Sequence, residues 1–452
     1  MRKLTLLIIL VVLCTVCLFS DYLFTNDLIN SPVALEKYHI IPMKNADFNQ
    51  ADVAWMLISS AFVLFMTPGL GFFYGGMVRK KNMISTILQS FIALGIMTIV
   101  WVVVGFSLAF GSDVGNLGII GNPFDFAFFN NVGTESAWEG AKTIPMLLFA
   151  LFQMKFAIIT PALVTGAFAE RIKFWSYILF MVIFSLFVYA PLAHMTWHPE
   201  GIMFQKGILD FAGGTVVHMS AGWAALAGAL ILKKRAEPEH DPSRITYVIL
   251  GTSMLWFGWF GFNAGSALGA TPLAVQAFAN TTIASAAAAI AWGFIEKIQG
   301  RKISGMGVCI GAVVGLVAIT PACGYVTIPH SIFIGVIASA VSSFMVHLRT
   351  KTEIDDTLDV FPCHGVGGMV GMILTGVFAS HAINPDVVKE QGLIYGEYSL
   401  FIKHFIALIG VSIFAFCSSW LILKFVDLIS PLRVSEKNEL LGLDITQHGE
   451  SL

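Results

Sequence analysis

The chain has 452 residues, of which 56% are hydrophobic and 12% charged, and its mean hydropathy is +0.79. Soluble domains carry about 25% charged residues, so this composition leaves too little polar surface to coat a soluble globule of this size. The net charge is −2 and the sequence has no basic tract, so no nucleic-acid partner is expected. Composition therefore predicts an all-α polytopic membrane protein in a lipid bilayer, because backbone groups in lipid must be satisfied internally.

The N-terminal segment has the pattern of an export signal. Residues 1–20 begin with Arg2 and Lys3 and continue as an apolar run of about 16 residues. This run is short for a transmembrane helix, which needs about 20 residues, so it predicts a signal peptide. Bulky residues before Ser20 make a poor cleavage site, which leaves a retained N-terminal anchor as the alternative. The polar stretch 21–50 is interpreted as an exported lead-in.

A transmembrane domain is predicted over residues 51–430, with eleven transmembrane helices. The apolar windows are 53–75, 83–110, 143–168, 174–196, 213–232, 246–267, 275–295, 304–322, 330–349, 364–381 and 402–427. Eleven spans divide into two five-helix inverted repeats plus a final helix, an arrangement that places a transport site between the halves near the midplane. Residues 431–452 are left as a C-terminal tail.

The distribution of basic residues predicts the orientation of the chain in the cell (plasma or inner) membrane. Five loops on one side carry 14 basic residues, and the opposite loops carry four. The positive-inside rule then puts the N-terminus outside and the tail, 431–452, in the cytoplasm.

Two histidines lie in strongly apolar surroundings. His218 is in "DFAGGTVVHMSAG" (210–222) and His364 is in "DDTLDVFPCHGVGG" (355–368), so each falls in the fifth helix of its half. A single membrane histidine is often a structural hydrogen-bonding residue, but two at equivalent positions favour a pathway, since ionisable groups in a membrane are costly. Neutral imidazole both donates and accepts hydrogen bonds. No third ligand follows either histidine at helical spacing, so no metal and no cofactor are expected here.

An aspartate precedes each of these histidines. For Asp359 we expect helix N-capping and a favourable interaction with the helix dipole. Asp210 is expected at the outer mouth, where a carboxylate lowers the energy of an arriving cation. It precedes His218 by eight residues, about 12 Å along a helix, so direct contact with the imidazole is not expected.

Aromatic residues recur on neighbouring predicted spans. Phe152 and Phe156 are four residues apart and share a helix face, and Trp197 closes the fourth span. The segment "WFGWFGFNAGSALG" (256–269) adds Trp259, Phe262, Asn263 and Ser266. Each aromatic alone is more often a packing or interfacial residue. Together, aromatic faces and a hydroxyl can hold a small cation by cation–π attraction.

Five separated motifs resemble the ammonium transporter family, which includes methylammonium permeases and Rhesus proteins. They are "DFAGGTVVH", "GAFAER", "WFGFNAGSA", "TPACGY" and "DDTLDVFPCHGVGG", within a similarity that runs from about residue 50 to 450. The match is closest to the prokaryotic Amt branch. The resemblance implies an eleven-helix fold, a homotrimer and one conducting pore per subunit.

The resemblance also implies roles for individual residues. Phe152, Phe156, Trp197 and Ser266 resemble an outer ammonium recruitment site, and Asp210 resembles the aspartate that supports it. Phe156 and Phe262 resemble the stacked rings above the pore. His218 and His364 resemble the twin pore histidines, with Trp259 placed among the pore residues. The tail "GLDITQHGESL" (442–452) resembles a cytoplasmic signature that takes part in regulation and in binding PII-type signal proteins.

Two departures from the family pattern stand near these residues. Lys155 adjoins Phe156 and is expected to turn aside from the pore, because it would repel a cation there. Pro362 and Cys363 replace the usual Gly–Val before His364, which is expected to shift the start of that helix.

The predicted function is ammonium transport without enzymatic catalysis. Recruitment of NH4+ would be followed by loss of a proton, passage of NH3 past the histidines and reprotonation inside, with the proton following or not. Two alternatives remain: an ammonium sensor of the same fold with little transport, and an intramembrane metal-dependent enzyme that uses His218, His364 and an aspartate.

Overall fold

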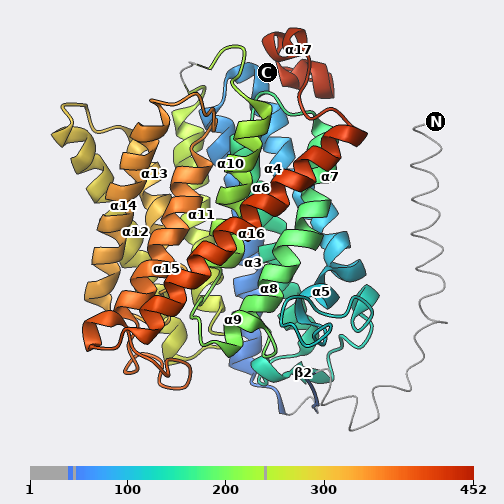
Figure 1. Ribbon diagram of the computed structural model, residues 1–452, viewed down its shortest axis with the longest axis vertical. Coiled ribbons are helices and arrows are strands. Elements are labelled where there is room, and N and C mark those ends of the chain that lie inside the picture. Colours follow the sequence, from blue (N-terminus) through green and yellow to red (C-terminus); the bar gives the residue numbers. More distant parts are fainter. Residues whose placement is uncertain (1–38, 44–46, 239–241) are drawn as a thin grey trace.

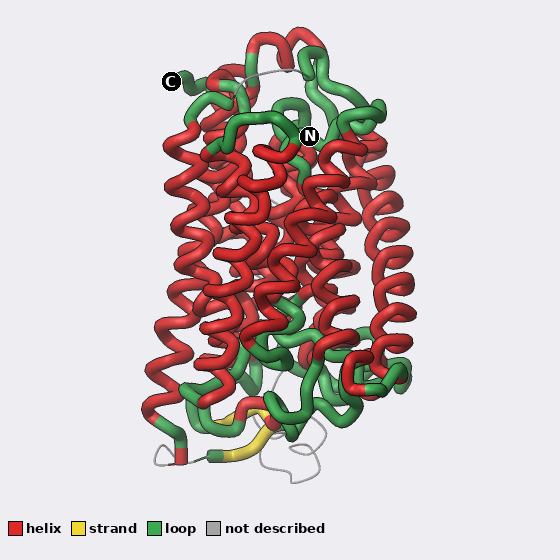
Figure 2. Tube along the Cα trace, turned by 90° about the vertical axis from the view of Figure 1, so that its left-hand side faces the viewer, coloured by secondary structure: helices red, strands yellow, loops and turns green. Residues whose placement is uncertain are grey.

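The computed structural model describes residues 39–43, 47–238 and 242–452. Long helices run side by side through one bundle, and loops collect at its two ends (Figures 1 and 2). One end carries the C-terminal helix α17 (Glu436–Leu441), and we call it the tail end; the opposite end carries a small sheet, and we call it the sheet end. The predicted signal peptide and most of the predicted lead-in lie outside the described residues.

The bundle is built from helices that match the apolar windows in order. They are α3 (Gln50–Met77), α4 (Met83–Val100), α5 (Phe106–Phe110), α6 (Met146–Phe168), α7 (Phe174–Phe184), α8 (Ala190–Trp197), α9 (Ile202–Gln205), α10 (Ser220–Leu232), α11 (Ile245–Gly265), α12 (Pro272–Ile298), α13 (Gly305–Ile319), α14 (Ile328–Arg349), α15 (Gly367–Phe378) and α16 (Ser399–Ile429). Five-residue π-helical turns join α4 to α5 and α7 to α8, so each of these pairs makes one continuous span.

Ten helical segments in the described part of the chain are long and apolar enough to cross a membrane. The predicted span at 304–322 corresponds to α13, which has 15 residues and therefore extends about 22 Å. A bilayer core is about 30 Å thick. The chain is thus a multi-pass helical membrane protein, and the number eleven stays a prediction.

Small residues allow the helices to pack closely. A Cβ atom added to Gly251 of α11 would lie 2.3 Å from the backbone nitrogen of Phe73 in α3, and one added to Gly69 would lie 2.8 Å from the Cβ of Met254. Such contacts are typical of helix pairs in membranes. Large apolar side chains such as Phe91, Leu421 and Ile290 are more than half exposed on the outside of the bundle, as expected of a lipid-facing surface.

The sheet end contains the only strands in the described residues. Strand β1 (Ile40–Pro42) pairs antiparallel with β2 (Ser136–Trp138), and Ile40 lies opposite Trp138. The pairing attaches a short part of the predicted lead-in to the long loop between α5 and α6.

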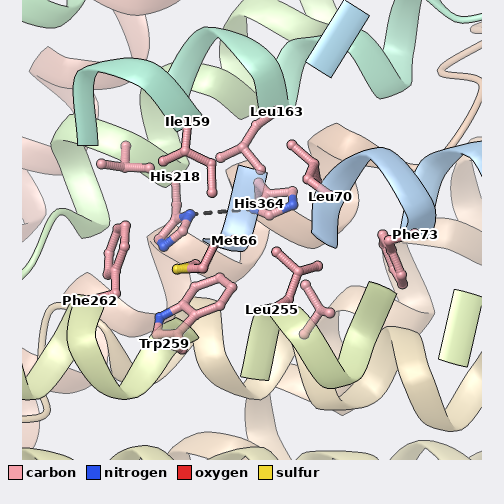
Figure 3. Close-up of a pocket in the computed structure, with 12 residues that line it drawn as sticks. Met66, Leu70, Phe73, Ile159, Leu163, His218, Leu255, Trp259, Phe262 and His364 are labelled. Atoms are coloured by element: carbon pink, nitrogen blue, oxygen red, sulfur yellow. Dashed lines mark hydrogen bonds between the residues drawn. The ribbon is translucent and has the colours of Figure 1, made fainter. Parts of the chain in front are cut away.

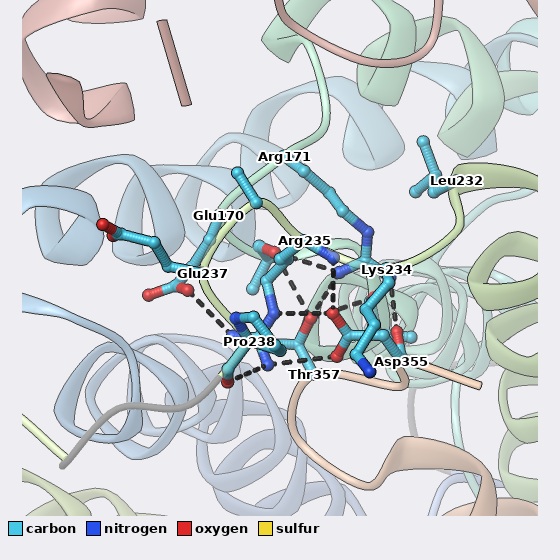
Figure 4. A network of polar contacts seen from close by, with 12 residues as sticks. Glu170, Arg171, Leu232, Lys234, Arg235, Glu237, Pro238, Asp355 and Thr357 are labelled. Atoms are coloured by element: carbon cyan, nitrogen blue, oxygen red, sulfur yellow. Dashed lines mark hydrogen bonds and ion pairs between the residues drawn. The ribbon is translucent and has the colours of Figure 1, made fainter. Parts of the chain in front are cut away.

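The tail end is held by a buried ionic network (Figure 4). Arg235 donates to Glu170 at 2.8 Å and to the Asp355 carboxylate at 2.9 Å, and all three side chains are about 5% exposed or less. Arg171 donates to the Asp355 backbone carbonyl and to the hydroxyl of Thr357. Burial works to raise the pKa of Asp355, but hydrogen bonds from Arg235 and the charges of both arginines prevail and lower it.

The C-terminal tail docks on this end through hydrogen bonds. The carboxylate of Asp444 accepts from the backbone N–H groups of Ile84 and Ser85 at 3.1 and 2.8 Å, which are first-turn donors of α4 with no partner inside the helix. The side-chain carbonyl of Asn82 accepts from the backbone of Leu443 at 2.8 Å. Because Glu439 accepts from the backbone of Ala236 at 2.6 Å, the tail also contacts the loop that carries Arg235.

Candidate functional site

Each of the two membrane histidines lies in a π-helical turn that opens a helix. His218 is in the turn Gly214–Met219 before α10, and His364 is in the turn Phe361–Val366 before α15. π-Helical turns are rare and frequently mark functional sites. The wider turn changes the direction in which the side chain leaves the helix, and here both histidines point into the bundle (Figure 3).

A glycine crossing brings the two histidine segments together. A Cβ atom added to Gly222 would lie only 2.2 Å from the Cα of Gly365, and one added to Gly368 would lie 3.2 Å from the Cβ of His218. No side chain fits between these backbones, so the two helix starts approach to contact distance. The glycines that follow each histidine in the sequence therefore have a geometric role.

The two imidazoles face each other at hydrogen-bonding distance. Nδ1 of His218 and Nδ1 of His364 are 3.4 Å apart, and the ring planes are inclined by 27°. The residues are 1% and 3% exposed. One Nδ1 must donate while the other accepts, so a single proton lies between the two rings. In the described part of the chain, Nε2 of His218 has no hydrogen-bond partner and is available to a solute.

A narrow apolar cavity contains both histidines (Figure 3). Its volume, counted for the centre of a water-sized molecule, is about 10 Å³, which is what one such molecule needs. The histidines supply its titratable side chains, and the remaining lining is Met66, Leu70, Phe73, Ile159, Leu163, Val217, Leu255, Trp259, Phe262 and Val313. A small neutral hydrogen-bonding solute suits this cavity, whereas a bare cation would lose its hydration without compensation.

Trp259 and Phe262 enclose His218 on one side. The ring centroids of Trp259 and Phe262 lie 5.3 and 6.0 Å from that of His218. The indole N–H of Trp259 donates to the hydroxyl of Thr320 at 2.9 Å, which satisfies its polar group and holds the ring. Sequence reasoning grouped Trp259 with the pore residues, and the structure has it in the cavity lining.

The predicted aromatic residues form a continuous row of rings that leads to the cavity. The centroid distances are 5.0 Å from Phe152 to Phe156 and 4.2 Å from Phe156 to Phe262, and Phe262 then contacts His218. Phe152 and Phe156 are fully buried. The Phe156 and Phe262 rings thus connect Phe152 with the histidine cavity.

Trp197 and Ser266 contact members of this row and are only partly buried. The Trp197 ring is 6.0 Å from Phe156 and inclined by 81°. The hydroxyl of Ser266 donates to the carbonyl of Phe262 at 2.8 Å, which leaves its lone pairs for another partner. Phe152 touches Phe156 and Gly265, so its contacts are those of a packing residue behind the row.

Asp210 supports this region through its backbone and caps the His218 segment. Its carboxylate accepts from the N–H groups of Gly213, Gly214 and Thr215 at 2.7–2.8 Å and from the Thr215 hydroxyl at 2.5 Å. Its carbonyl accepts the indole N–H of Trp197 at 3.1 Å. Burial raises the pKa of this carboxyl, and the same hydrogen bonds oppose the shift. The carboxylate thus organises its own segment instead of facing an open mouth.

The expectation that Asp359 caps the second histidine segment is wrong. Asp356 accepts from the N–H groups of Val360 and Phe361 at 3.0 and 2.7 Å, whereas Asp359 pairs with Arg349 at 2.5 Å. Asp359 has a positive φ of 57°, which turns its side chain away from the helix start. The missed signal was spacing: Asp356 precedes His364 by eight residues, as Asp210 precedes His218.

The two departures from the family pattern have visible consequences. Lys155 is half-buried with its ammonium 3.8 Å from the sulfur of Met154, and the described lining of the histidine cavity does not include it. Pro362 occupies the first turn of the helix that begins at Phe361, a position where a proline costs no backbone hydrogen bond. The helix therefore begins three residues before the predicted window 364–381.

Comparisons with known proteins agree with this architecture. Residues 54–452 match the model of the Ammonium Transporter Family. An ammonium transporter of Aquifex aeolicus is 46% identical over 90% of this chain and 94% of its own length. Crystalline Mep2 of Saccharomyces cerevisiae superposes with a TM-score of 0.81 at 34% identity, covering 86% of this chain and 89% of the other. A solved sensor Amt protein superposes with a TM-score of 0.80 at 26% identity, covering 90% and 100%. The chain therefore belongs to the ammonium transporter family.

Proposed function

We propose that this protein conducts ammonium across the cell membrane by passing it through the histidine cavity as neutral NH3. NH4+ is recruited between Trp197, Phe156 and the Ser266 hydroxyl, and Phe152 supports the Phe156 ring from behind. The ion gives a proton to water on the recruitment side before the Phe156–Phe262 pair. NH3 then passes Trp259, His218 and His364 and is reprotonated on the far side.

The observation that carries this proposal is the facing imidazole pair in a cavity of about 10 Å³ with an otherwise apolar or aromatic lining. Ammonia can donate to and accept from imidazole nitrogens, and it carries no charge that needs hydration. An ion in the same place would face a desolvation cost that the lining does not repay. Membership of a transporter family favours transport over enzymatic chemistry.

Orientation and assembly belong to the same proposal. The 14-to-4 excess of basic residues in the loops favours a cytoplasmic tail end, which puts the recruitment residues outside. A homotrimer with one pore per subunit and two inverted five-helix repeats are part of the proposed arrangement. The docked tail, with Asp444 on the first turn of α4, is a suitable place for a PII-type regulator to act.

Flux in proteoliposomes tests the proposal. Ammonium uptake and membrane current are recorded together for the wild type, for the double variant His218→Leu/His364→Leu, and for the control His381→Leu. His381 is an exposed histidine in the loop after α15. Removing the hydrogen-bonding pair should cost about 1–3 kcal/mol, a loss of roughly 5- to 100-fold, while His381→Leu behaves as wild type. Full, ammonium-selective transport by the double leucine variant would contradict the role of the histidines.

The sensor is a second candidate because one structural neighbour is a sensor Amt protein. The same experiment separates the two functions. Saturable ammonium binding to wild-type protein with no flux above that of empty liposomes would favour the sensor.

A further inference from the structure

A second cluster of histidines lies at the sheet end, away from the cavity. The ligand atoms of His39, His198 and Glu200 all lie within 4.8 Å of one another. We propose that these three side chains bind a borderline-soft divalent cation, and that this cation is zinc. This site is separate from ammonium conduction and does not depend on the proposed function.

His39 has the hydrogen bonding of a metal-ligating histidine. Its Nδ1 lies 2.8 Å from a carboxylate oxygen of Glu139, which fixes the proton on Nδ1 and leaves a lone pair on Nε2. That Nε2 is buried, has no hydrogen-bond partner in the described residues, and lies 4.0 Å from a Glu200 oxygen. Histidines that bind metals usually donate their other N–H to a carboxylate in this manner.

His198 presents its own lone pair to the other carboxylate oxygen of Glu200. Its Nδ1 accepts the backbone N–H of Glu200 at 3.2 Å and lies 3.9 Å from a Glu200 carboxylate oxygen. The ring is fully buried, stacks on His194 at 4.4 Å and meets the ring of His39 edge-on at 5.1 Å. The ring is therefore held rigidly, and a metal would replace one long hydrogen bond.

The fold brings these residues together from distant positions. Pairing of β1 with β2 puts His39 beside Glu139, whose N–H donates to the His39 carbonyl at 2.8 Å. His198 directly follows the last residue of α8. A metal would therefore attach the three-residue strand β1 to the end of the long α7–α8 span.

The distances fit a site that closes slightly on binding. Zinc lies about 2.0–2.2 Å from nitrogen and oxygen ligands in tetrahedral geometry, so neighbouring ligand atoms are about 3.4 Å apart. The separations of 3.9 and 4.0 Å, which end on different Glu200 oxygens, must shrink by about half an ångström, and the ligand atoms, all within 4.8 Å of one another, must converge on one point. The Glu200 side chain is 42% exposed and can make this movement.

The surroundings supply an entry route and a fourth ligand. An open hollow lined by Glu200, Asp113, Asn116 and Asn122 adjoins the cluster, so water can complete the coordination. Two imidazoles and one carboxylate favour zinc, nickel or copper, whereas calcium and magnesium prefer oxygen ligands. His198 adjoins Trp197, so metal binding would also restrain the segment that carries the recruitment tryptophan.

Zinc titration of untagged, chelator-stripped full-length protein in detergent tests the site. We expect one zinc per chain by elemental analysis, a rise in the thermal midpoint on adding zinc, and no such effect of magnesium. His39→Ala and Glu200→Gln should each weaken zinc binding at least tenfold and abolish the thermal shift. Glu139→Gln should weaken it about 10- to 100-fold, and the exposed His381→Ala should leave it unchanged.

The outcome that overturns the proposal is equally specific. Absence of saturable zinc binding by the wild type, or equal affinity in the wild type and Glu200→Gln, would make the cluster a purely ionic contact between protonated His39 and its two glutamates. Glu200→Gln is conservative and partly exposed, so it keeps the test valid even if His39→Ala does not fold.

Discussion

The two histidine segments reach the same geometry with different stabilising contacts. In both, an aspartate eight residues before the histidine caps a π-helical turn that opens a helix. At the sheet end, the hydrogen bonds of the Asp210 carboxylate all go to its own segment. At the tail end, Asp356 makes two such bonds, and its neighbours Asp355 and Asp359 pair with Arg235 and Arg349. The common requirement is the capped turn, while the surrounding charges differ.

This difference gives the two histidines unequal connections to the rest of the molecule. Asp355 joins the His364 segment to Arg235, and the loop that carries Arg235 contacts the tail through Glu439. The His218 segment instead contacts Trp197 through the Asp210 carbonyl. The tail is therefore linked to the His364 segment through the Arg235 loop, and Trp197 is linked to the His218 segment.

The largest effect is expected from breaking the ionic support of the tail-end segment. In Asp355→Asn, Arg235 keeps Glu170 but loses the charged partner on its other side. Removing one member of a buried pair costs about 3–5 kcal/mol, and the remaining glutamate favours the lower figure. Denaturant unfolding in detergent micelles measures the change.

The matched control is Glu353→Gln, because Glu353 is 90% exposed and, among the described residues, its ion pair is with Lys234 at the surface. It should change the unfolding free energy by less than about 1 kcal/mol.

Because the pKa of Asp355 is lowered in the folded protein, the stability difference between the wild type and Asp355→Asn should depend on pH. The stabilisation by Asp355 is present above the ordinary aspartate pKa and is lost as the pH falls through the lowered value, so the wild type and variant should converge in acid. A constant difference down to strongly acidic pH would contradict the ionic interpretation.

The next effect compares the two capping aspartates directly. Asp210→Ala leaves three buried N–H groups and one hydroxyl without their acceptor, whereas Asp356→Ala leaves two N–H groups. Loss of a helix cap costs about 0.5–2 kcal/mol, and buried unsatisfied donors add to it. We expect about 3 kcal/mol for Asp210→Ala and about half of that for Asp356→Ala. Equal losses, or a larger loss for Asp356→Ala, would show that neighbouring charges outweigh capping.

Much of the fold was accessible from sequence because helices in lipid are long and apolar. The windows locate the helices, and the cost of placing imidazole in a membrane singled out His218 and His364, which the structure brings together in one cavity. The cap at Asp356 was missed because three acidic residues stand close together at 355–359, and only the backbone at Asp359, with its positive φ, decides between them. The cluster of His39, His198 and Glu200 was missed because strand pairing creates it, and three paired residues carry little sequence pattern.

A smaller effect is expected from crowding the point where the two segments cross. Gly222→Ala would place a methyl group on the backbone of Gly365, and overpacking of this kind costs about 1–3 kcal/mol. The control is Gly410→Ala in α16, where an added Cβ meets nothing within 4 Å; it should be neutral or stabilising, since alanine favours helix. The free energy of unfolding and the ammonium flux should both fall for Gly222→Ala and stay unchanged or rise for Gly410→Ala. Unchanged stability and flux in Gly222→Ala would mean that the backbones of Gly222 and Gly365 lie farther apart than the structure has them.

The smallest effect is expected at Trp197, which contacts Phe156 and the Asp210 carbonyl before the His218 segment. Trp197→Leu removes one π face next to Phe156, together with the indole N–H that the Asp210 carbonyl accepts. Loss of one cation–π face costs about 1–2 kcal/mol, so the half-saturating ammonium concentration should rise roughly 5- to 30-fold and discrimination against other cations should weaken. Trp175→Leu is the control, because Trp175 is 62% exposed at the other end of the bundle.

Flux measured across a range of ammonium concentrations separates capture from conduction. Weaker capture raises the half-saturating concentration, whereas a displaced His218 lowers the maximal rate. A lowered maximal rate at unchanged half-saturation would assign Trp197 to holding the Asp210 segment in place instead of binding ammonium. Unchanged kinetics in both variants would make Trp197 a packing residue.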